Sequence, residues 1–189
     1  MKVLKFGGYA IDSAENILKV KEIVNSQTVP VVIVVSALHG ITDKLLELSH
    51  LAATRDKNFF RLHTEIEVKH QDIINTLFEE PVREKILNKV SAWLKDLISI
   101  INGVYQLNDL TPKIQDKILS FGEIMSCYII SNVLENAEMV DAKGLIKTDD
   151  NFGNAKVNFP LSDRLIRAQF NRYKKTAVVP GFIASSEHN

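Results

Sequence analysis

The stretch Val3-Leu4-Lys5-Phe6-Gly7-Gly8 has the residue types of a phosphate-binding turn. Its first residues suit a buried strand, and two glycines then remove every side chain where the strand should turn into a helix beginning near Asp12. Glycine allows positive φ and close backbone approach, so the amides of Gly7 and Gly8 can face phosphate oxygens while Lys5 supplies a mobile charge. Ordinary strand-to-helix turns share this pattern, so these residues alone leave both interpretations open.

A second unusual stretch, Ser120-Phe121-Gly122-Glu123, lies inside a predicted long helix over 112–136. Glycine in a helix interior costs about 1 kcal/mol relative to alanine, so close approach by another backbone or by a ligand should offset it. Glu123 has apolar neighbours, and a buried carboxylate needs a cationic partner. The alternative is that Glu123 lies on a solvated helix face.

The histidines form no metal-ligand set, and no metal site is predicted. His63 and His70 lie two turns apart on one predicted helix, too far to share a metal ion without further ligands. We expect both histidines to be surface residues.

Composition limits the classes of protein to which the chain can belong. Its 189 residues, 46% of them hydrophobic, fit one large domain or one lobe of a larger one. The 23 basic residues balance 23 acidic residues, so we expect no nucleic-acid partner and no anionic membrane surface. A single cysteine, Cys127, and the absence of an apolar signal region or membrane-length run favour a cytoplasmic location.

The elements that must position the candidate residues follow an α/β rhythm. The apolar run 29–35 is typical of a parallel strand covered on both faces, and it ends in a small-residue loop that contains Ser36 and Thr42. The predicted strands cover 3–6, 29–35, 137–140 and 176–179, and the predicted helices beside the 112–136 helix cover 12–26, 43–53 and 161–173.

Residues 58–110 are helical in pattern throughout and are interrupted at Pro81. We therefore predict a helical hairpin inserted into the α/β pattern. Trp93 is expected to pack between these helices rather than to stack on a ligand.

Five short motifs occur in the order and approximate spacing of aspartate kinases, and the chain resembles that family over nearly its whole length. They are Lys5-Phe6-Gly7-Gly8, Val35-Ser36-Ala37 with Gly40-Ile41-Thr42, Ser120-Phe121-Gly122-Glu123, Thr148-Asp149-Asp150-Asn151-Phe152-Gly153 and Val179-Pro180-Gly181-Phe182-Ile183.

The resemblance implies the amino-acid-kinase fold, an α/β fold of three αβα layers with a mainly parallel sheet. Residues 1–189 correspond to the N-terminal lobe of its catalytic domain, with the 58–110 hairpin as an insertion. This insertion resembles the aspartokinase portion of bifunctional aspartokinase–homoserine dehydrogenases, although shorter monofunctional relatives carry comparable segments.

Roles for individual residues also follow from the resemblance, position by position. The residues that correspond to the nucleotide and phosphate site are Lys5, Gly7, Gly8 and Ser36, with Lys5 on the transferring phosphoryl group. Those that correspond to the aspartate site are Thr42, Glu123, Asp150 and Phe152, with Glu123 on the substrate ammonium.

The implied reaction is attack of the β-carboxylate of L-aspartate on the γ-phosphate of ATP, assisted by Mg²⁺, which gives aspartyl phosphate and ADP. It opens the synthesis of the aspartate-family amino acids. No general base is required, because the carboxylate is already ionised at neutral pH. The full-length form is expected to be a homo-oligomer.

Two departures from the family pattern leave alternatives open. Tyr9-Ala10 stands where the family usually has Thr-Ser, and the Gly-Arg-Gly-Gly-Ser-Asp segment that follows Ile183 in the family is missing. We expect a fragment of a longer chain that is inactive alone. The alternatives are a non-catalytic module that binds an amino acid or a partner subunit, and a kinase of another small carboxylate or carbamate.

Overall fold

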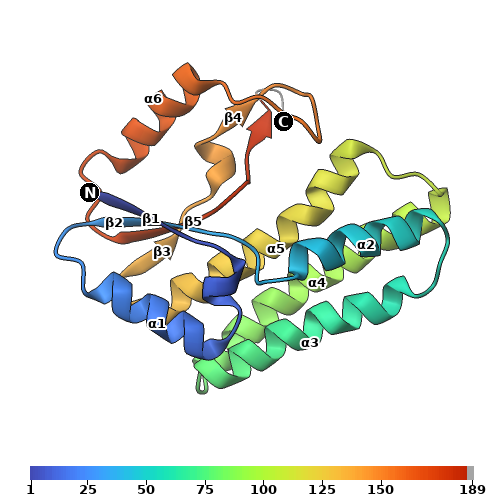
Figure 1. Cartoon of the computed structure of the whole chain (residues 1–189), viewed down its shortest axis with the longest axis horizontal. Coiled ribbons are helices and arrows are strands. Elements are labelled where there is room, and N and C mark those ends of the chain that lie inside the picture. Colours follow the sequence, from blue (N-terminus) through green and yellow to red (C-terminus); the bar gives the residue numbers. More distant parts are fainter. Residues whose placement is uncertain (187–189) are drawn as a thin grey trace.

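The computed structural model describes residues 1–186 and shows an α/β fold with a parallel sheet between layers of helices (Figure 1). The sheet has the strand order β1-β2-β5-β3, and every neighbouring pair is parallel. Its strands are β1 (Lys2–Phe6), β2 (Val31–Val35), β5 (Thr176–Pro180) and β3 (Ala137–Met139). The predicted fold class is therefore confirmed.

Helices cover both faces of the sheet, which explains why β2 is apolar along its whole length. On one face lie α1 (Ala14–Asn25) and α5 (Pro112–Val133), and on the other lies α6 (Phe159–Phe170). Alternate residues of β2 face the two sides: Ile33 belongs to the larger apolar cluster, and Val32 packs with Ala177 and Val179 on the α6 side.

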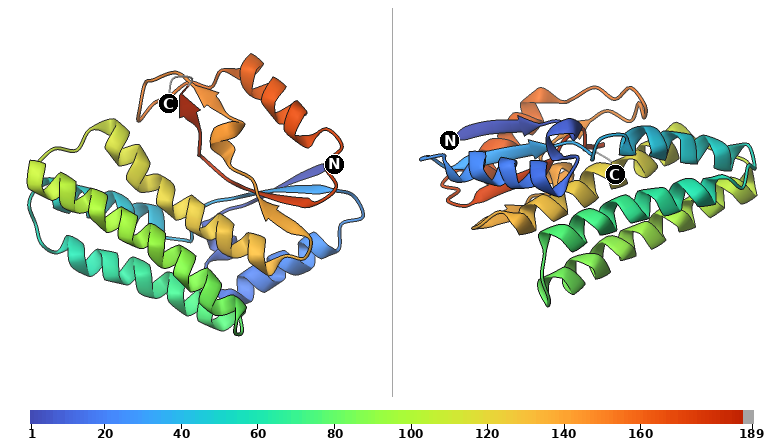
Figure 2. Two further views of the ribbon diagram at one scale, coloured as in Figure 1. Left: turned by 180° about the vertical axis from the view of Figure 1, so that it is seen from behind. Right: turned by 60° about the horizontal axis from the view of Figure 1, so that its bottom comes forward.

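Four helices form a bundle beside the sheet, as the two views of Figure 2 show. They are α2 (Ile41–Ala53), α3 (Phe59–Leu77), α4 (Val82–Leu107) and α5. In α4, Trp93 packs edge-on against Tyr128 of α5 with ring centroids 5.3 Å apart, so it lies between helices as expected. The hydroxyl of Thr111 caps α5 by accepting from the amide of Ile114 at 3.3 Å, and Pro112 occupies the first turn.

Element boundaries differ from the sequence-based expectations at several places. A short 3-10 turn, Gly8–Ile11, precedes α1, and the predicted strand 29–35 begins only at Val31 because Val29 and Pro30 are exposed. A second, two-stranded parallel sheet pairs β4 (Lys147–Thr148) with β6 (Ser185–Ser186). Strands of two residues carry too little periodicity to be seen in a sequence.

Gly122 sits at the closest approach between α5 and the segment that follows β2. A Cβ atom at this position would lie 2.8 Å from the Cβ of Ala37, 3.3 Å from Leu45 and 3.4 Å from Ile41. The prediction of a close approach is right, but the partners are side chains of the loop and of α2 rather than a backbone or a ligand.

His70 corrects one expectation, because it is fully buried in α3 rather than at the surface. Its Nδ1 lies 2.7 Å from the carbonyl oxygen of Ile66, whereas Nε2 has no hydrogen-bond partner among the described residues. Burial lowers the pKa of His70 to about 4, so the imidazole is neutral at pH 7. His63 is half-buried and its Nε2 lies 3.1 Å from the carbonyl oxygen of Leu94.

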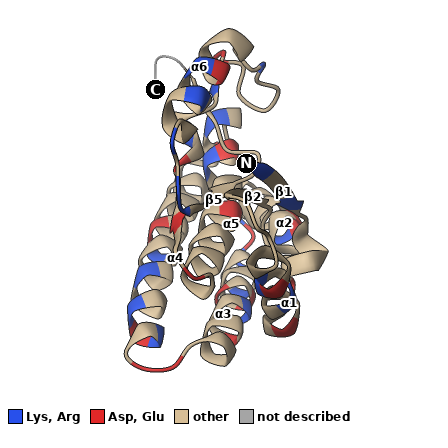
Figure 3. Ribbon diagram, turned by 90° about the vertical axis from the view of Figure 1, so that its left-hand side faces the viewer, with Lys and Arg blue, Asp and Glu red and all other residues tan. Residues whose placement is uncertain are grey.

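Lys and Arg residues are interspersed with Asp and Glu residues along the helices visible in Figure 3, in keeping with a net charge of zero. No helix within residues 1–186 is long and apolar enough to cross a membrane.

We predict that Gly122→Ala destabilises the protein by about 1–2 kcal/mol, although alanine favours helices. The added methyl group would overlap Ala37, and overpacking of this kind outweighs the gain of about 1 kcal/mol in helix propensity. Gly103→Ala in α4 is the matched control, because a Cβ there meets nothing within 4 Å and should stabilise the fold. Urea unfolding of both variants checks this; equal stabilisation by the two would contradict the packing argument.

We further predict a loss of stability of about 2 kcal/mol between pH 7 and pH 5 that depends on His70. The pKa of this histidine is lower in the folded state than in the unfolded state. Its contribution to the free energy of unfolding is therefore fully present above pH 6.5 and is lost as the pH falls towards 4. His70→Leu should flatten this part of the curve, and the exposed His50→Gln should not. The free energy of unfolding at pH 5, 6 and 7 measures the effect, and equal slopes in all three proteins would contradict it.

Candidate functional site

The carboxyl ends of β1, β2 and β5 lie side by side and form the floor of the candidate site. Phe6 pairs with Val35, and the amide of Ser36 donates to the carbonyl oxygen of Phe6 at 3.2 Å. The amide of Gly181, just past β5, donates to the carbonyl oxygen of Val35 at 2.7 Å. Three chain segments that are distant in sequence therefore leave the sheet at one edge, where open parallel sheets bind ligands.

The two glycines after β1 serve different purposes. A Cβ on Gly8 would lie 3.0 Å from the carbonyl oxygen of Ala37, so Gly8 allows the turn to pack against the loop after β2. A Cβ on Gly7 would meet nothing within 4 Å, so this side of the turn is open. Gly7 has a φ of −77° and Gly8 begins the 3-10 turn, so the expected use of positive φ is wrong and the expected close approach is right.

Lys5 stands one residue before the end of β1 with an exposed side chain. Its Nζ lies 5.4 Å from the centre of the Phe182 ring, and no carboxylate within residues 1–186 pairs with it. Phe182 follows β5 with a φ of 56° and is 87% exposed. An unpaired cation at the strand ends can take an anionic ligand.

The loop after β2 connects the sheet to α2. The hydroxyl of Ser126 in α5 donates to the carbonyl oxygen of Ser36 at 2.6 Å and fixes the start of this loop. Gly40, with a φ of 76°, ends the loop at the N-cap of α2. Thr42 lies exposed in the first turn of α2, where the helix dipole favours negative groups.

Glu123 is buried, with 6% of its surface exposed, so the solvated-face alternative is wrong. Desolvation raises the pKa of its carboxyl, an effect partly offset by hydrogen bonds from its own amide and from the amide of Ala37. No cationic side chain within residues 1–186 forms an ion pair with it. A buried carboxylate with only amide donors is costly, and a ligand cation would relieve that cost.

The acidic loop 148–153 is attached to the first turns of α5, the helix that carries Glu123. The amide of Gly153, which has a φ of 81°, donates to a carboxylate oxygen of Asp116 at 2.8 Å. The Nζ of Lys113 lies 5.2 Å from the centre of the Phe152 ring. Asp150 is exposed.

The structure thus brings Lys5, Gly7, Gly8 and Ser36 to one edge of the sheet. Glu123 joins them, because its carboxylate accepts a hydrogen bond from the amide of Ala37 in the loop after β2. Thr42 stands at the start of the adjoining α2. The loop with Asp150 and Phe152 is connected to this group through α5, by the Gly153–Asp116 hydrogen bond, and through the pairing of β4 with β6.

Sequence reasoning missed Asp116 and Ser126, two residues that attach α5 to the neighbouring loops. Neither lies in a recognisable motif, and a polar residue every few positions is usual on any helix, so no sequence signal singled them out.

Tyr9, the departure from the family pattern, lies across the turn from the loop after β2. Its ring stacks on His39 with centroids 3.7 Å apart and an angle of 24° between the planes. The Tyr9 side chain is nevertheless 75% exposed. Its phenol therefore faces outward from the floor of the site and joins the two loops by a ring contact.

Comparison with known proteins shows which family this chain is similar to. The model of the amino acid kinase family matches residues 1–189. A bifunctional aspartokinase/homoserine dehydrogenase of Buchnera aphidicola is 29% identical over 99% of this chain and 24% of its own length. An aspartokinase of Chlamydia pneumoniae is 29% identical over 97% of this chain and 39% of its own length.

The fold also matches solved structures. Escherichia coli aspartokinase III in complex with lysine and aspartate superposes with a TM-score of 0.89 at 21% identity, over the whole of this chain and 42% of that one. The same enzyme in complex with aspartate and ADP gives a TM-score of 0.86 at 23% identity.

This chain spans between 24% and 42% of the length of the relatives described. Because the family model nevertheless covers every residue, the chain belongs to the amino acid kinase family.

Proposed function

We propose that this chain forms the aspartate-binding and phosphate-binding part of an aspartate kinase, which transfers the γ-phosphate of ATP to the β-carboxylate of L-aspartate. The observation that carries the proposal is the buried carboxylate of Glu123, which has no cationic partner among the described residues, beside strand ends that present the unpaired cation of Lys5. A zwitterionic amino acid and a nucleotide phosphate together supply the charges that complement these two side chains.

The names of the relatives support the choice of substrate. Those described above are aspartokinases, alone or joined to homoserine dehydrogenase, and E. coli aspartokinase III was solved with aspartate and ADP. For this chain, aspartate and ATP are inferred from that likeness together with the charges of the site. Activity is proposed for a protein that also contains the parts of the relatives that this chain does not span.

The proposed role of the site is to align two anions. Lys5 neutralises the phosphoryl group, and the open turn at Gly7 and Gly8 admits the phosphates close to the backbone. Glu123 is proposed to orient the substrate by its ammonium group. Thr42 is proposed to contact the amino acid and Ser36 the phosphate, each through its hydroxyl group. Asp150 and Phe152 belong to a loop that is proposed to close over the substrate.

Mg²⁺ is expected to enter with ATP as part of the nucleotide substrate, held chiefly by phosphate oxygens and water. Within residues 1–186 no group of three or more His, Cys, Asp or Glu side chains could hold a metal ion. The proposed roles of Lys5 and Glu123 do not depend on a resident metal.

A second candidate is a module that binds an amino acid without catalysis, and Tyr9 favours it. A phenol in place of a small hydroxyl removes one phosphate contact of the family pattern, and its stacking on His39 occupies the edge of the turn.

A kinase of another small carboxylate is the third candidate. Self-association of the full-length protein stays a prediction.

We predict that Lys5→Ala lowers the kcat of the kinase reaction about 100-fold or more, because the cation aligned with the phosphoryl group is removed. Aspartyl-hydroxamate formation with ATP, Mg²⁺ and aspartate measures this in the full-length chain that contains these residues. Lys2→Ala is the control, because Lys2 lies on the same strand and bonds Gln27 instead.

Two outcomes would change the proposal. Full activity in Lys5→Ala would remove Lys5 from the phosphate site. No activity in the unaltered full-length protein, with aspartate still bound, would favour the non-catalytic module.

We also predict that Glu123→Gln weakens aspartate binding about 30-fold while it stabilises the ligand-free protein. Glutamine keeps the acceptor for the Ala37 amide but removes a buried charge, so the free protein gains and the substrate ammonium loses its partner. Because burial raises the pKa of Glu123, affinity for aspartate should also fall as the pH is lowered and the carboxyl becomes protonated.

Calorimetric titration of aspartate and the melting temperature measure the two effects. Glu47→Gln, an exposed residue of α2, is the control and should change neither. A Glu123→Gln protein that loses stability and keeps its affinity for aspartate would assign Glu123 to the fold rather than to the substrate.

A further inference from the structure

Lys69 of α3 contacts both loops that border the candidate site. Its Nζ lies 2.5 Å from a carboxylate oxygen of Asp12 and donates to the carbonyl oxygen of His39 at 2.9 Å. Asp12 is the residue directly after the 3-10 turn that begins at Gly8, and His39 directly precedes the N-cap of α2. One ammonium group therefore joins the end of the phosphate turn, by which we mean residues 7–12, to the loop after β2.

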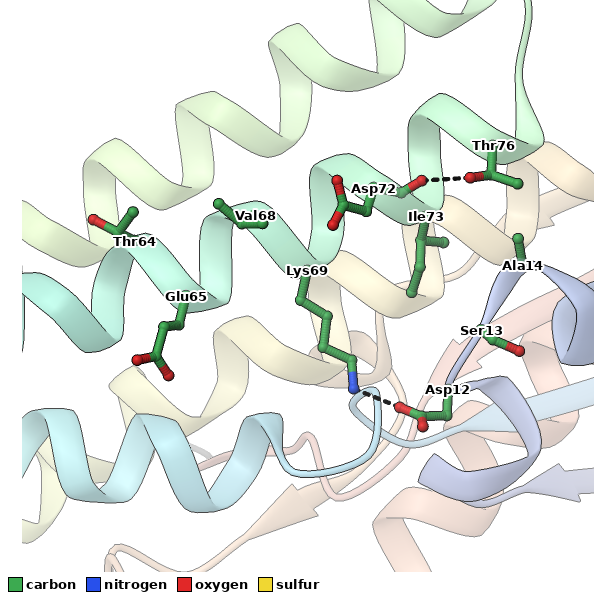
Figure 4. Close-up of a pocket in the computed structure, with 10 residues that line it drawn as sticks. All are labelled: Asp12, Ser13, Ala14, Thr64, Glu65, Val68, Lys69, Asp72, Ile73 and Thr76. Carbon is green, nitrogen blue, oxygen red and sulfur yellow. Dashed lines mark hydrogen bonds and ion pairs between the residues drawn. The ribbon is translucent and has the colours of Figure 1, made fainter.

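The position of Lys69 follows from the helical insertion. Helix α3 passes beside the start of α1, and Lys69 reaches from it across to the turn (Figure 4). It stands on the wall of a pocket of about 510 Å³ that also includes Ser13, Val68 and Ile73. The pocket leaves room around the side chain, so a residue of similar length can replace Lys69 without a clash.

The two loops have few other links to each other. Gly8 packs against the backbone of Ala37 and His39, and the ring of Tyr9 stacks on that of His39. The stacked rings are largely exposed, and the Lys69 ammonium supplies the charged link between the same two segments.

The Lys69–Asp12 pair is half-exposed, with 30% and 34% of the side-chain surfaces accessible. Ion pairs of this exposure add little to global stability. Its main effect is thus expected on the relative position of the two loops, and misplacement of binding groups by about 1 Å can cost about 100-fold in rate.

We propose that Lys69 is a positioning residue, by which the inserted hairpin holds the phosphate turn and the loop before α2 in register for the reaction. The effect on catalysis rests on the proposed kinase function, whereas the effect on the two loops does not. Lys69 itself touches neither reactant.

The matched control is Lys44, which pairs with Glu65 and joins α2 to the same helix α3. The Lys44–Glu65 pair has similar exposure, 35% and 39%, and its side chains bond each other and Arg61 rather than either loop. Lys69→Met and Lys44→Met therefore each remove one interhelical or helix-to-loop ion pair of comparable exposure, while Lys69→Arg keeps the charge.

Hydrogen–deuterium exchange of this chain tests the positioning directly. Peptides that cover 7–14 and 36–43 contain the amides of Ala10 and Ile41, which close the two turns. Lys69→Met should speed exchange at least about threefold in both peptides, and Lys44→Met in neither. Equal exchange in the two variants would overturn the proposal.

Steady-state kinetics of the full-length chain test the catalytic consequence. Lys69→Met should lower kcat/KM for ATP and for aspartate about tenfold or more, Lys69→Arg should restore most of it, and Lys44→Met should match the unaltered protein at a similar melting temperature. Unchanged kcat/KM in Lys69→Met would overturn the proposal. An unaltered full-length protein without activity would contradict the kinase function, and the exchange data would then decide the role of Lys69 alone.

Discussion

The packing of Gly122 against Ala37 is the constraint on which the site depends. It sets the distance between α5 and the loop after β2, and the next residue, Glu123, therefore meets the Ala37 amide. Gly8 likewise allows a close approach to that loop, because a Cβ atom there would lie 3.0 Å from the carbonyl oxygen of Ala37. Two glycines thus enclose one small loop, and the polar groups around it come together because the backbones are close.

Charge is distributed in the site in a way that stability alone does not favour. Lys5 and Glu123 each lack a partner of opposite sign among the described residues, although the chain as a whole is balanced. Lys44 and Lys69, for which no contact with a ligand is proposed, are paired with carboxylates. Charged side chains that stay unpaired beside the edge of a parallel sheet are typical of binding sites, since the ligand completes the charge balance.

Much of this arrangement follows from the sequence, because the α/β rhythm and the motifs at strand ends are local patterns. The burial of His70 did not follow, since a histidine on an amphipathic helix can lie on either face and only the packing of α3 decides. The partners of Gly122 were likewise unpredictable, because a glycine inside a helix indicates a close contact but does not indicate which residues approach it. The Lys69–Asp12 pair spans 57 residues and depends on how the hairpin is placed.

The strand order β1-β2-β5-β3 has a consequence for the folding of the chain. The strand between β2 and β3 is β5, which is the last of the four to be synthesised, so the central sheet cannot close until residue 180 has left the ribosome. The helices α2, α3 and α4 are consecutive in sequence and pack mainly on one another and on α5, so their contacts can form first. The floor of the ligand site, which the ends of β1, β2 and β5 form, is therefore completed only after the helical bundle has been synthesised.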